Sequence, residues 1–204
     1  WIVLKLSSGE YFLFHLMMTG KLLLNPKNES KHDRLILYLS GNTKLVFNDI
    51  RKFGKCRITD SLKNLAGQDA LQISFPDFKK LITVKNRNIK IFLLDQKHIA
   101  GIGNIYADEI LWEASIHPLQ KTNTLKHFEI LKLFKSIKRI LRLAIKKGGT
   151  SSRDYRKPDN TEGQYYKIRK VYQRTGESCA KCGGIIQRIV VGGRSTHFCP
   201  KHQK

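Results

Sequence analysis

Short runs of apolar residues fill the first 60 positions of the chain. The runs "WIVLKL" and "YFLFHLMM" flank the polar cluster "SSGE", and the runs "RLILYLS" and "KLVFND" lie on either side of Gly41-Asn42. Apolar runs around a Gly- or Asn-containing turn are typical of antiparallel β-hairpins. Residues 1–60 are therefore predicted to form two hairpins.

Helical periodicity begins near residue 78, after a polar stretch at 61–78 that is predicted to be a linker. The stretch "IAGIGNIYADEILWEASIHP" predicts a glycine-rich turn at 101–103, followed by a helix that ends near Pro118. Free N–H groups at the start of this helix would attract an anion.

A second, longer helix is predicted to follow. Thr122 or Thr124 can cap its start, and Gly148-Gly149 marks its end. Spacings of three and four residues define its predicted buried face, which consists of Leu125, Phe128, Leu131, Phe134, Ile137, Leu141 and Ala144. Strands followed by helices indicate an α+β protein.

The charge of the chain indicates a polyanionic partner. Its 204 residues include 38 Lys and Arg against 16 Asp and Glu, a net charge of +22 that is spread along the sequence. Binding to nucleic acid is expected, because each phosphate that is neutralised releases condensed counterions. A lysine-rich protein without such a partner is the alternative. No apolar run is long enough to span a membrane, so a cytoplasmic protein without a membrane partner is expected.

Three of the four cysteines lie in one C-terminal stretch, "SCAKCGGIIQRIVVGGRSTHFCPKH". A Cys-x-x-Cys pair and a third cysteine after a hairpin-length interval fit the zinc-ribbon pattern. The predicted Cys3His ligands of one structural Zn²⁺ are Cys179, Cys182, Cys199 and His202. His197 is an alternative fourth ligand. The remaining cysteine, Cys56, is predicted to be a buried apolar residue.

The interval between these cysteines predicts a hairpin that turns at Gly192-Gly193-Arg194. A metal-fixed turn would present Arg194 outward. A rigidly held guanidinium of this kind is suited to binding phosphate.

Four stretches of the chain, in the right order, resemble the bacterial formamidopyrimidine-DNA glycosylases. They are "HLMMTGKLLL" at 15–24, "IRKFG" at 50–54, "LLDQKHIAGIGNIYADEILW" at 93–112 and "VVGGRSTHFCP" at 190–200. The resemblance covers nearly the whole chain. It implies the remainder of an N-terminal β-sandwich domain at 1–75, a helix-two-turn-helix domain at 76–149, and a lesion-recognition loop with a C-terminal zinc ribbon hairpin at 150–204.

The resemblance also implies roles for individual side chains. Met18 matches the side chain that fills the space of a flipped nucleotide, and Arg51 and Phe53 match the pair that completes this wedge. Arg194 matches a finger arginine that grips phosphate and assists the second elimination. The residues that match phosphate contacts are His15, His32, Arg87 and Asn104. Thr150 and Tyr155 lie near the root of a stretch, 150–166, that matches a mobile loop. Glu109 matches an acid of the motif, for which loop bracing and catalysis are both open.

The implied activity is excision of oxidised purines from double-stranded DNA by base flipping and Schiff-base β,δ-elimination, by a monomer that also binds abasic sites. The family's nucleophile is a proline amine, aided by a glutamate and a lysine, and all three match positions before Trp1. Residues 1–204 are therefore expected to bind damaged DNA without supplying the nucleophile.

Three alternatives to this activity stay open. They are a non-catalytic damaged-DNA-binding protein, an endonuclease VIII-like pyrimidine glycosylase, and an RNA-associated zinc ribbon. The third leaves "AGIGNIYADE" unexplained, and Phe53 with the long loop favours the purine enzymes over the second.

Overall fold

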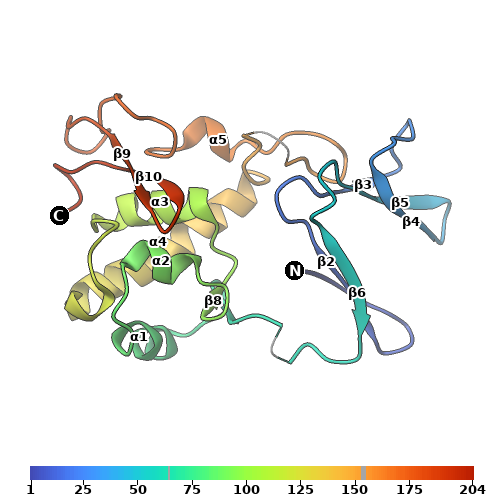
Figure 1. Cartoon of the computed structure of the whole chain (residues 1–204), viewed down its shortest axis with the longest axis horizontal. Coiled ribbons are helices and arrows are strands. Elements are labelled where there is room, and N and C mark those ends of the chain that lie inside the picture. Colours follow the sequence, from blue (N-terminus) through green and yellow to red (C-terminus); the bar gives the residue numbers. More distant parts are fainter. Residues whose placement is uncertain (64, 153–154) are drawn as a thin grey trace. The chain divides into compact units, whose positions relative to one another are not determined.

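The computed structural model describes residues 1–63, 65–152 and 155–204. The chain forms two compact units, one made of residues 1–63 and 144–168 and the other of the remaining described residues (Figure 1). Strands dominate the first unit and helices the second, which confirms the α+β prediction. The three-domain division at residues 75 and 149 stays a prediction.

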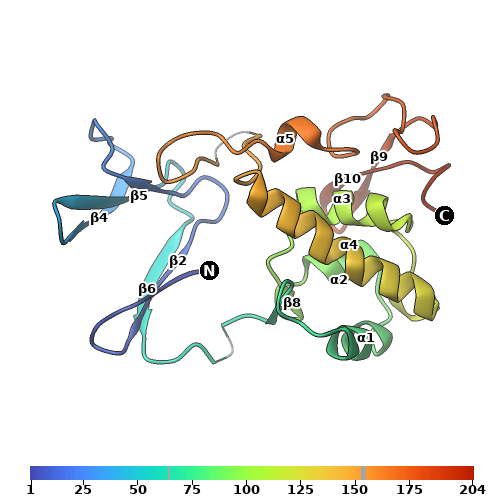
Figure 2. The same cartoon turned by 180° about the vertical axis from the view of Figure 1, so that it is seen from behind.

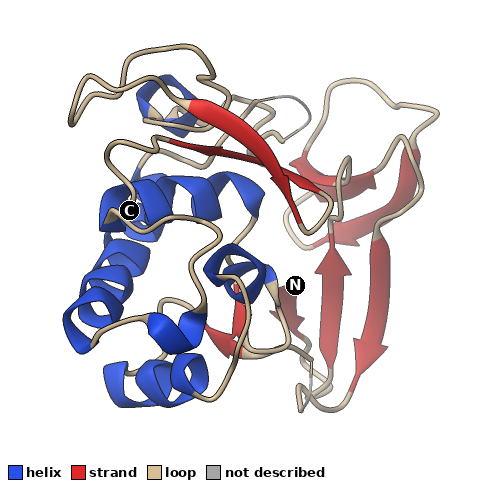
Figure 3. Cartoon of the chain, turned by 60° about the vertical axis from the view of Figure 1, so that its left-hand side comes forward, coloured by secondary structure: helices blue, strands red, loops and turns tan. Residues whose placement is uncertain are grey.

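Two three-stranded antiparallel sheets make up most of the first unit, and their strands are red in Figure 3. The strand orders are β1-β2-β6 and β3-β5-β4. The strands are β1 (Ile2–Lys5), β2 (Tyr11–His15), β3 (Lys21–Leu24), β4 (Asp33–Leu39), β5 (Thr43–Asn48) and β6 (Lys55–Thr59). The rings of Phe14 and Phe47, one from each sheet, lie 5.6 Å apart, so the two sheets share one core.

Both predicted hairpins are present. Strand β1 pairs with β2 across the "SSGE" turn, and β4 pairs with β5 across Gly41-Asn42. Gly41 and Asn42 both have positive φ, 69° and 55°. This turn type matches the right-handed twist of paired strands and favours Gly and Asn.

Helices form most of the second unit. Its elements are β7 (Gln68–Asp69), α1 (Phe75–Thr83), α2 (Ile89–Leu94), β8 (Ile99–Ala100), α3 (Asn104–Ala114), the 3₁₀ turn η1 (Thr122–Thr124), β9 (Gln187–Val191) and β10 (Arg194–Phe198). Helix α4 (His127–Lys146) continues into the first unit, which also holds α5 (Tyr165–Ile168). None of the described helices is both long and apolar enough to cross a membrane.

Helix α4 forms a layer behind α2 and α3. It lies behind them in Figure 1 and in front of them in Figure 2. Aromatic side chains join the layers, because the Phe134 ring of α4 lies 5.6 Å from Phe78 of α1, which in turn lies 6.4 Å from Phe92 of α2.

The predicted linker at 61–78 is wrong at its C-terminal end, because α1 begins at Phe75. Ser74 caps this helix and accepts a hydrogen bond from the Asp77 N–H. Pro76 lies in the first turn, where a proline loses no intrahelical hydrogen bond. Helix α3 begins after the glycine turn as predicted, and it ends at Ala114, earlier than Pro118, because Ser115 adopts a left-handed φ of 62°.

The predicted threonine caps of α4 are wrong. Thr122 is buried, and its hydroxyl donates to the Lys85 carbonyl. The helix begins at His127, where Glu129 accepts a 2.7 Å hydrogen bond from the Lys126 N–H. The predicted end is confirmed, since Gly148 and Gly149 have φ of 69° and 85°.

The predicted buried face of α4 is partly wrong. Phe128 is 64% exposed, whereas the buried apolar residues of the helix are Ile130, Leu133, Ile137, Ile140, Leu141 and Ala144. Phe128 precedes Ile137 by nine residues, which at about 100° per residue places it half a turn away. Repeated steps of three residues drift from the true period, and the prediction followed that drift.

Cys56 is exposed, so its predicted burial is wrong. It lies in β6, the edge strand of its sheet, whose residues from Lys55 to Ile58 are all exposed. An edge strand has a neighbour on one side only, which leaves its side chains less covered.

Substitution of one buried and one exposed residue tests the face of α4. Ile137→Ala is expected to lower the free energy of unfolding by about 2–5 kcal/mol, because Ile137 is fully buried. Phe128→Ala removes a larger side chain and is expected to change it by about 0.5 kcal/mol or less. Urea denaturation measures both, and equal losses would contradict the assigned face.

Candidate functional site

Three cysteine thiols gather at the base of the β9-β10 hairpin. The sulfurs of Cys179, Cys182 and Cys199 all lie within 4.8 Å of one another, and the Cys182 and Cys199 sulfurs are 3.5 Å apart. A tetrahedral zinc with Zn–S bonds of about 2.3 Å requires sulfurs about 3.8 Å apart. The donor set and its spacing therefore fit Zn²⁺.

The turn between the first two cysteines aims both thiols at one point. The N–H groups of Cys182 and Gly183 donate to the Cys179 carbonyl, and Gly183 has a φ of 67°. Burial disfavours ionisation of Cys179, but hydrogen bonds from the Lys181 N–H, the Trp112 indole and Cys182 outweigh it and lower its pKa to about 7. Burial raises the pKa of Cys199 to about 11.

Neither candidate histidine nitrogen lies within this cluster of thiols. The His202 Nε2 lies 2.9 Å from the Trp112 carbonyl oxygen and 3.2 Å from the Ser115 hydroxyl. His197 is buried, and its Nδ1 lies 3.1 Å from Asp108. The structure thus brings the three thiols together and places both histidines beside other polar partners.

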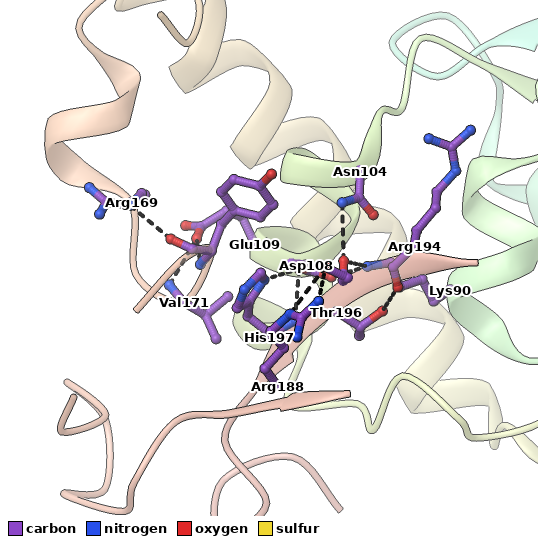
Figure 4. A network of polar contacts seen from close by, with 12 residues as sticks. Lys90, Asn104, Asp108, Glu109, Arg169, Val171, Arg188, Arg194, Thr196 and His197 are labelled. Carbon is purple, nitrogen blue, oxygen red and sulfur yellow. Dashed lines mark hydrogen bonds and ion pairs between the residues drawn. The ribbon is translucent and has the colours of Figure 1, made fainter. Parts of the chain in front are cut away.

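A buried charge network joins the hairpin to the helices, as Figure 4 shows. The Lys90 ammonium of α2 donates to Asp108 Oδ1 of α3 at 2.5 Å and to the Ser195 carbonyl at 3.0 Å. Asp108 Oδ2 accepts from the His197 N–H at 2.9 Å, and the Asn104 amide donates to Ser195 at 3.1 Å. Strand β10 is therefore held to two helices at Ser195 and His197, the residues on either side of Thr196.

Because the network is buried, the charge of each member depends on the presence of its partner. The side chains of Lys90 and Asp108 are both 0% exposed. Burial lowers the pKa of Lys90, Asp108 opposes that shift, and the nearby charge of Arg194 adds to it.

Arg194 lies directly beside the anchored residues of the hairpin. Gly192 and Gly193 form a two-residue turn with φ of 57° and 74°, and Val191 pairs with Arg194 across it. Arg194 is exposed, and its guanidinium is directed away from the other labelled residues of Figure 4. The predicted outward presentation of Arg194 is thus seen in the structure.

Glu109 braces a loop. Its buried carboxylate accepts hydrogen bonds of 2.8–3.1 Å from the consecutive N–H groups of Lys170, Val171 and Tyr172. Burial raises the pKa of Glu109 in spite of these bonds. Of the two roles left open by the sequence, these contacts correspond to loop bracing.

The three predicted wedge residues come together on the first unit. Arg51 Nη1 lies 3.3 Å from the Met18 sulfur, and the Arg51 guanidinium lies 4.5 Å from the centre of the Phe53 ring. Met18 is 66% exposed and Phe53 is 49% exposed. Two exposed apolar side chains are thus braced by one cation.

Asp49 organises the wedge, and the sequence motifs did not single it out. Its carboxylate is 1% exposed and accepts hydrogen bonds from the Thr19 hydroxyl and from the N–H groups of Arg51 and Gly54. Burial disfavours its ionisation, but these donors lower the pKa of Asp49 below its usual range. The signal in the sequence was an aspartate just before the "IRKFG" motif.

The predicted phosphate-binding residues are spread over both units. His15 Nδ1 accepts from the Met17 N–H at 3.1 Å, and His32 Nδ1 lies 3.4 Å from Arg34. Arg87 forms a 2.8 Å ion pair with Asp95. Asn104 opens α3, as predicted, and its amide also contacts the hairpin.

The predicted lesion loop at 150–166 includes residues 153 and 154, which lie outside the described residues. Thr150 is buried and forms a β-bridge with Gln164, which closes the base of the loop. Tyr155 is exposed and its ring lies against Gly149, where an added Cβ would come within 2.7 Å of it. The Pro158 carbonyl accepts from the Leu24 N–H of β3.

Three stretches of the chain match the sequence profiles of known domains. Residues 1–56 match the formamidopyrimidine-DNA glycosylase N-terminal domain, residues 67–156 match its H2TH domain, and residues 176–201 match the zinc finger found in FPG and IleRS. The formamidopyrimidine-DNA glycosylase of Carboxydothermus hydrogenoformans is 42% identical over 208 residues, which cover 100% of this chain and 78% of that protein. The chain belongs to the formamidopyrimidine-DNA glycosylase family.

Solved structures of the formamidopyrimidine-DNA glycosylase family have the same fold. A complex between the Lactococcus lactis Fpg and an abasic site containing DNA is 37% identical with a TM-score of 0.89, covering 99% of this chain and 78% of that one. The MutM (Fpg) protein from Thermus thermophilus is 35% identical with a TM-score of 0.89, covering 98% of this chain and 78% of that one. The predicted family, its helix-two-turn-helix domain and its zinc finger are confirmed.

Removal of the metal tests the cysteine cluster. One Zn²⁺ per chain is expected, and an excess of chelator is expected to unfold the hairpin, because the binding energy of a structural zinc stabilises the fold. Metal analysis and thermal denaturation measure both effects. Cys199→Ala is expected to lose the zinc and Cys56→Ala to keep it. A Cys199→Ala protein that retains one zinc per chain would contradict the site.

Removal of one partner tests the buried charge network. Lys90→Met is expected to lower the free energy of unfolding by about 3–5 kcal/mol, because it leaves the Asp108 carboxylate buried without its cation. Lys135→Met, at an exposed position of α4, serves as the control and is expected to have little effect. Urea denaturation measures the free energy of unfolding of both variants. Similar values for Lys90→Met and Lys135→Met would contradict the stabilising role of the network.

Proposed function

We propose that this chain binds double-stranded DNA at an oxidised purine or an abasic site and fills the space of the flipped nucleotide with Met18, Arg51 and Phe53. The observation that carries the proposal is the contact among these three exposed side chains. An apolar side chain inserted between bases offsets the cost of unstacking, which is a few kcal/mol. Arg51 adds hydrogen-bond donors that can face the unpaired base.

The relatives of this chain support the choice of substrate. Solved structures similar to it hold an abasic site containing DNA, a Fapy-dG containing DNA and a carbocyclic 8-oxo-G containing DNA. We infer that the same lesions are recognised here and that their excision follows the Schiff-base β,δ-elimination of the family, with an amine nucleophile that residues 1–204 are not expected to supply. We also infer that the protein acts as a monomer in the bacterial cytoplasm.

Arg194 is proposed to grip a DNA phosphate. The anchored turn holds its backbone, and its guanidinium is exposed and free to donate to two phosphate oxygens at once. The net charge of +22 also favours a polyanionic partner.

His15 is proposed to donate a hydrogen bond to a second phosphate. Burial lowers the pKa of His15, so the neutral ring is favoured. Because Nδ1 accepts from the Met17 N–H, the proton of the neutral ring lies on Nε2, which can serve as a donor.

The other proposed DNA contacts follow from the hydrogen-bond donors that each residue does not use within the protein. Asn104 would act through the free N–H groups at the start of α3, since its amide already serves the hairpin. Arg87 keeps donors beyond its pair with Asp95. His32, Thr150 and Tyr155 stay proposals on the strength of the family match alone.

His202 is proposed as the fourth zinc ligand. The Trp112 carbonyl can only accept, so the hydrogen bond at 2.9 Å requires the proton on His202 Nε2. Nδ1 then carries the lone pair. Zinc-binding histidines usually donate their second N–H to a carbonyl or carboxylate in this way. The zinc would keep the hairpin folded and take no part in the chemistry.

Binding measurements on two adjacent methionines test the proposed wedge. Met18→Ala is expected to weaken binding to a duplex with a stable abasic analogue by about 10- to 150-fold, because a methionine side chain buried between bases contributes roughly 1.5–3 kcal/mol. Binding to the intact duplex is expected to be unchanged. Met17→Ala is the matched control, since Met17 is also exposed and lies next to Met18.

Fluorescence anisotropy at fixed salt gives all of these affinities. The proposed wedge is refuted if Met18→Ala keeps the full preference for the abasic duplex. It is refuted equally if Met17→Ala loses that preference to the same extent.

A further inference from the structure

We infer that Asp49 is a positioning residue for DNA recognition, and that the hydrogen bond from Thr19 to Asp49 fixes Met18 relative to Arg51 and Phe53. The inference rests on the wedge proposed above and adds the device that holds it in shape. Neither Asp49 nor Thr19 is part of the wedge surface, because both are at least nine-tenths buried.

Asp49 shapes the loop that carries Arg51 and Phe53. Its Oδ1 accepts from the Arg51 N–H at 3.2 Å, and its Oδ2 accepts from the Gly54 N–H at 2.7 Å. Between these two points Lys52 has a φ of 59°, a left-handed conformation that is unfavourable for lysine. The carboxylate thus holds both ends of a strained loop, which would otherwise have alternatives of lower energy.

Thr19 ties the second loop to the first. Its hydroxyl donates to Asp49 Oδ1 at 2.5 Å, across 30 residues of sequence, and it also accepts from the Arg51 N–H at 3.4 Å. Thr19 directly follows Met18 in a turn that the Gly20 N–H closes by donating to the Leu16 carbonyl. A buried hydrogen bond to a charged acceptor is among the stronger single contacts in proteins.

The wedge side chains cannot hold this arrangement by themselves. Their contacts are one N–H to a thioether and one cation over a ring, and both are open to water. Long exposed side chains lose considerable conformational entropy when they are ordered. If the backbones of the two loops beneath these side chains are already ordered, less conformational entropy is lost on binding. The affinity for the distorted DNA is then higher.

A graded set of substitutions tests the inference. Thr19→Val keeps the shape of the side chain and removes only the tie between the loops. Thr19→Ser keeps the hydroxyl and is the matched control. Asp49→Asn replaces one acceptor oxygen by a donor and disturbs both loops. Each variant of the 204-residue chain is assayed for affinity toward an intact duplex and toward a duplex with an abasic analogue.

Thr19→Val is expected to lower the preference for the abasic duplex roughly tenfold, with unchanged affinity for intact DNA. Thr19→Ser is expected to behave like the parent chain, and Asp49→Asn to lose at least as much as Thr19→Val. A Thr19→Val protein that keeps the full preference would overturn the inference. So would one whose affinities for intact and abasic DNA fall in parallel with its thermal midpoint, since that is the behaviour of a merely structural contact.

The Met18→Ala variant separates this inference from the proposed wedge. If Met18→Ala has no effect on the preference, the wedge itself fails and the positioning role of Asp49 fails with it. If Met18→Ala loses the preference and Thr19→Val keeps it, the wedge stands and only the role of Asp49 and Thr19 is refuted.

Discussion

The pair between Lys90 and Asp108 is fully out of water, and the position of the β9-β10 hairpin depends on it. A charge that leaves water costs several kcal/mol, so each member of the pair is stable in place only while the other is present. The same two side chains also bind the backbone at Ser195 and His197. The contacts that neutralise the buried charges therefore also fix the hairpin on the helices. The position of the exposed Arg194 is set by these buried groups.

Buried carboxylates have the same use elsewhere in this basic chain. Asp49 holds the loops that carry Met18, Arg51 and Phe53, and Glu109 holds the three N–H groups at 170–172. The chain has only 16 acidic residues against 38 basic ones. An acid placed inside, under hydrogen-bond donors, can organise a loop without presenting a carboxylate to the phosphates of DNA, which would repel it at close range. These buried acids thus position the loops from inside and are not part of the surface that meets DNA.

Local signals in the sequence were sufficient for the hairpins, the helix after Gly103 and the cysteine pair, because each depends on residues within one turn of one another. The face of α4 was harder to predict, since a drift in phase exchanged Phe128 for Ile130 and Leu133. The exposure of Cys56 depends on which strand lies at the edge of a sheet, and no short pattern reports that. The contacts from Asp49 to Thr19 and from Asp108 to His197 span 30 and 89 residues, so only the fold reveals them. The wedge residues were named from a family resemblance, and their mutual contact came from the structure.

The tip of the β9-β10 hairpin has two residues, Gly192 and Gly193, both with positive φ. Successive side chains of a strand point to opposite faces, so one inserted residue would shift the pairing register and reverse every side chain of β10. Thr196 would leave the core, and the guanidinium of Arg194 would move to the other side of the ribbon. The fold therefore constrains the length of this segment as well as its composition, and a deletion or insertion at the tip is expected to be tolerated less well than many substitutions of its neighbours.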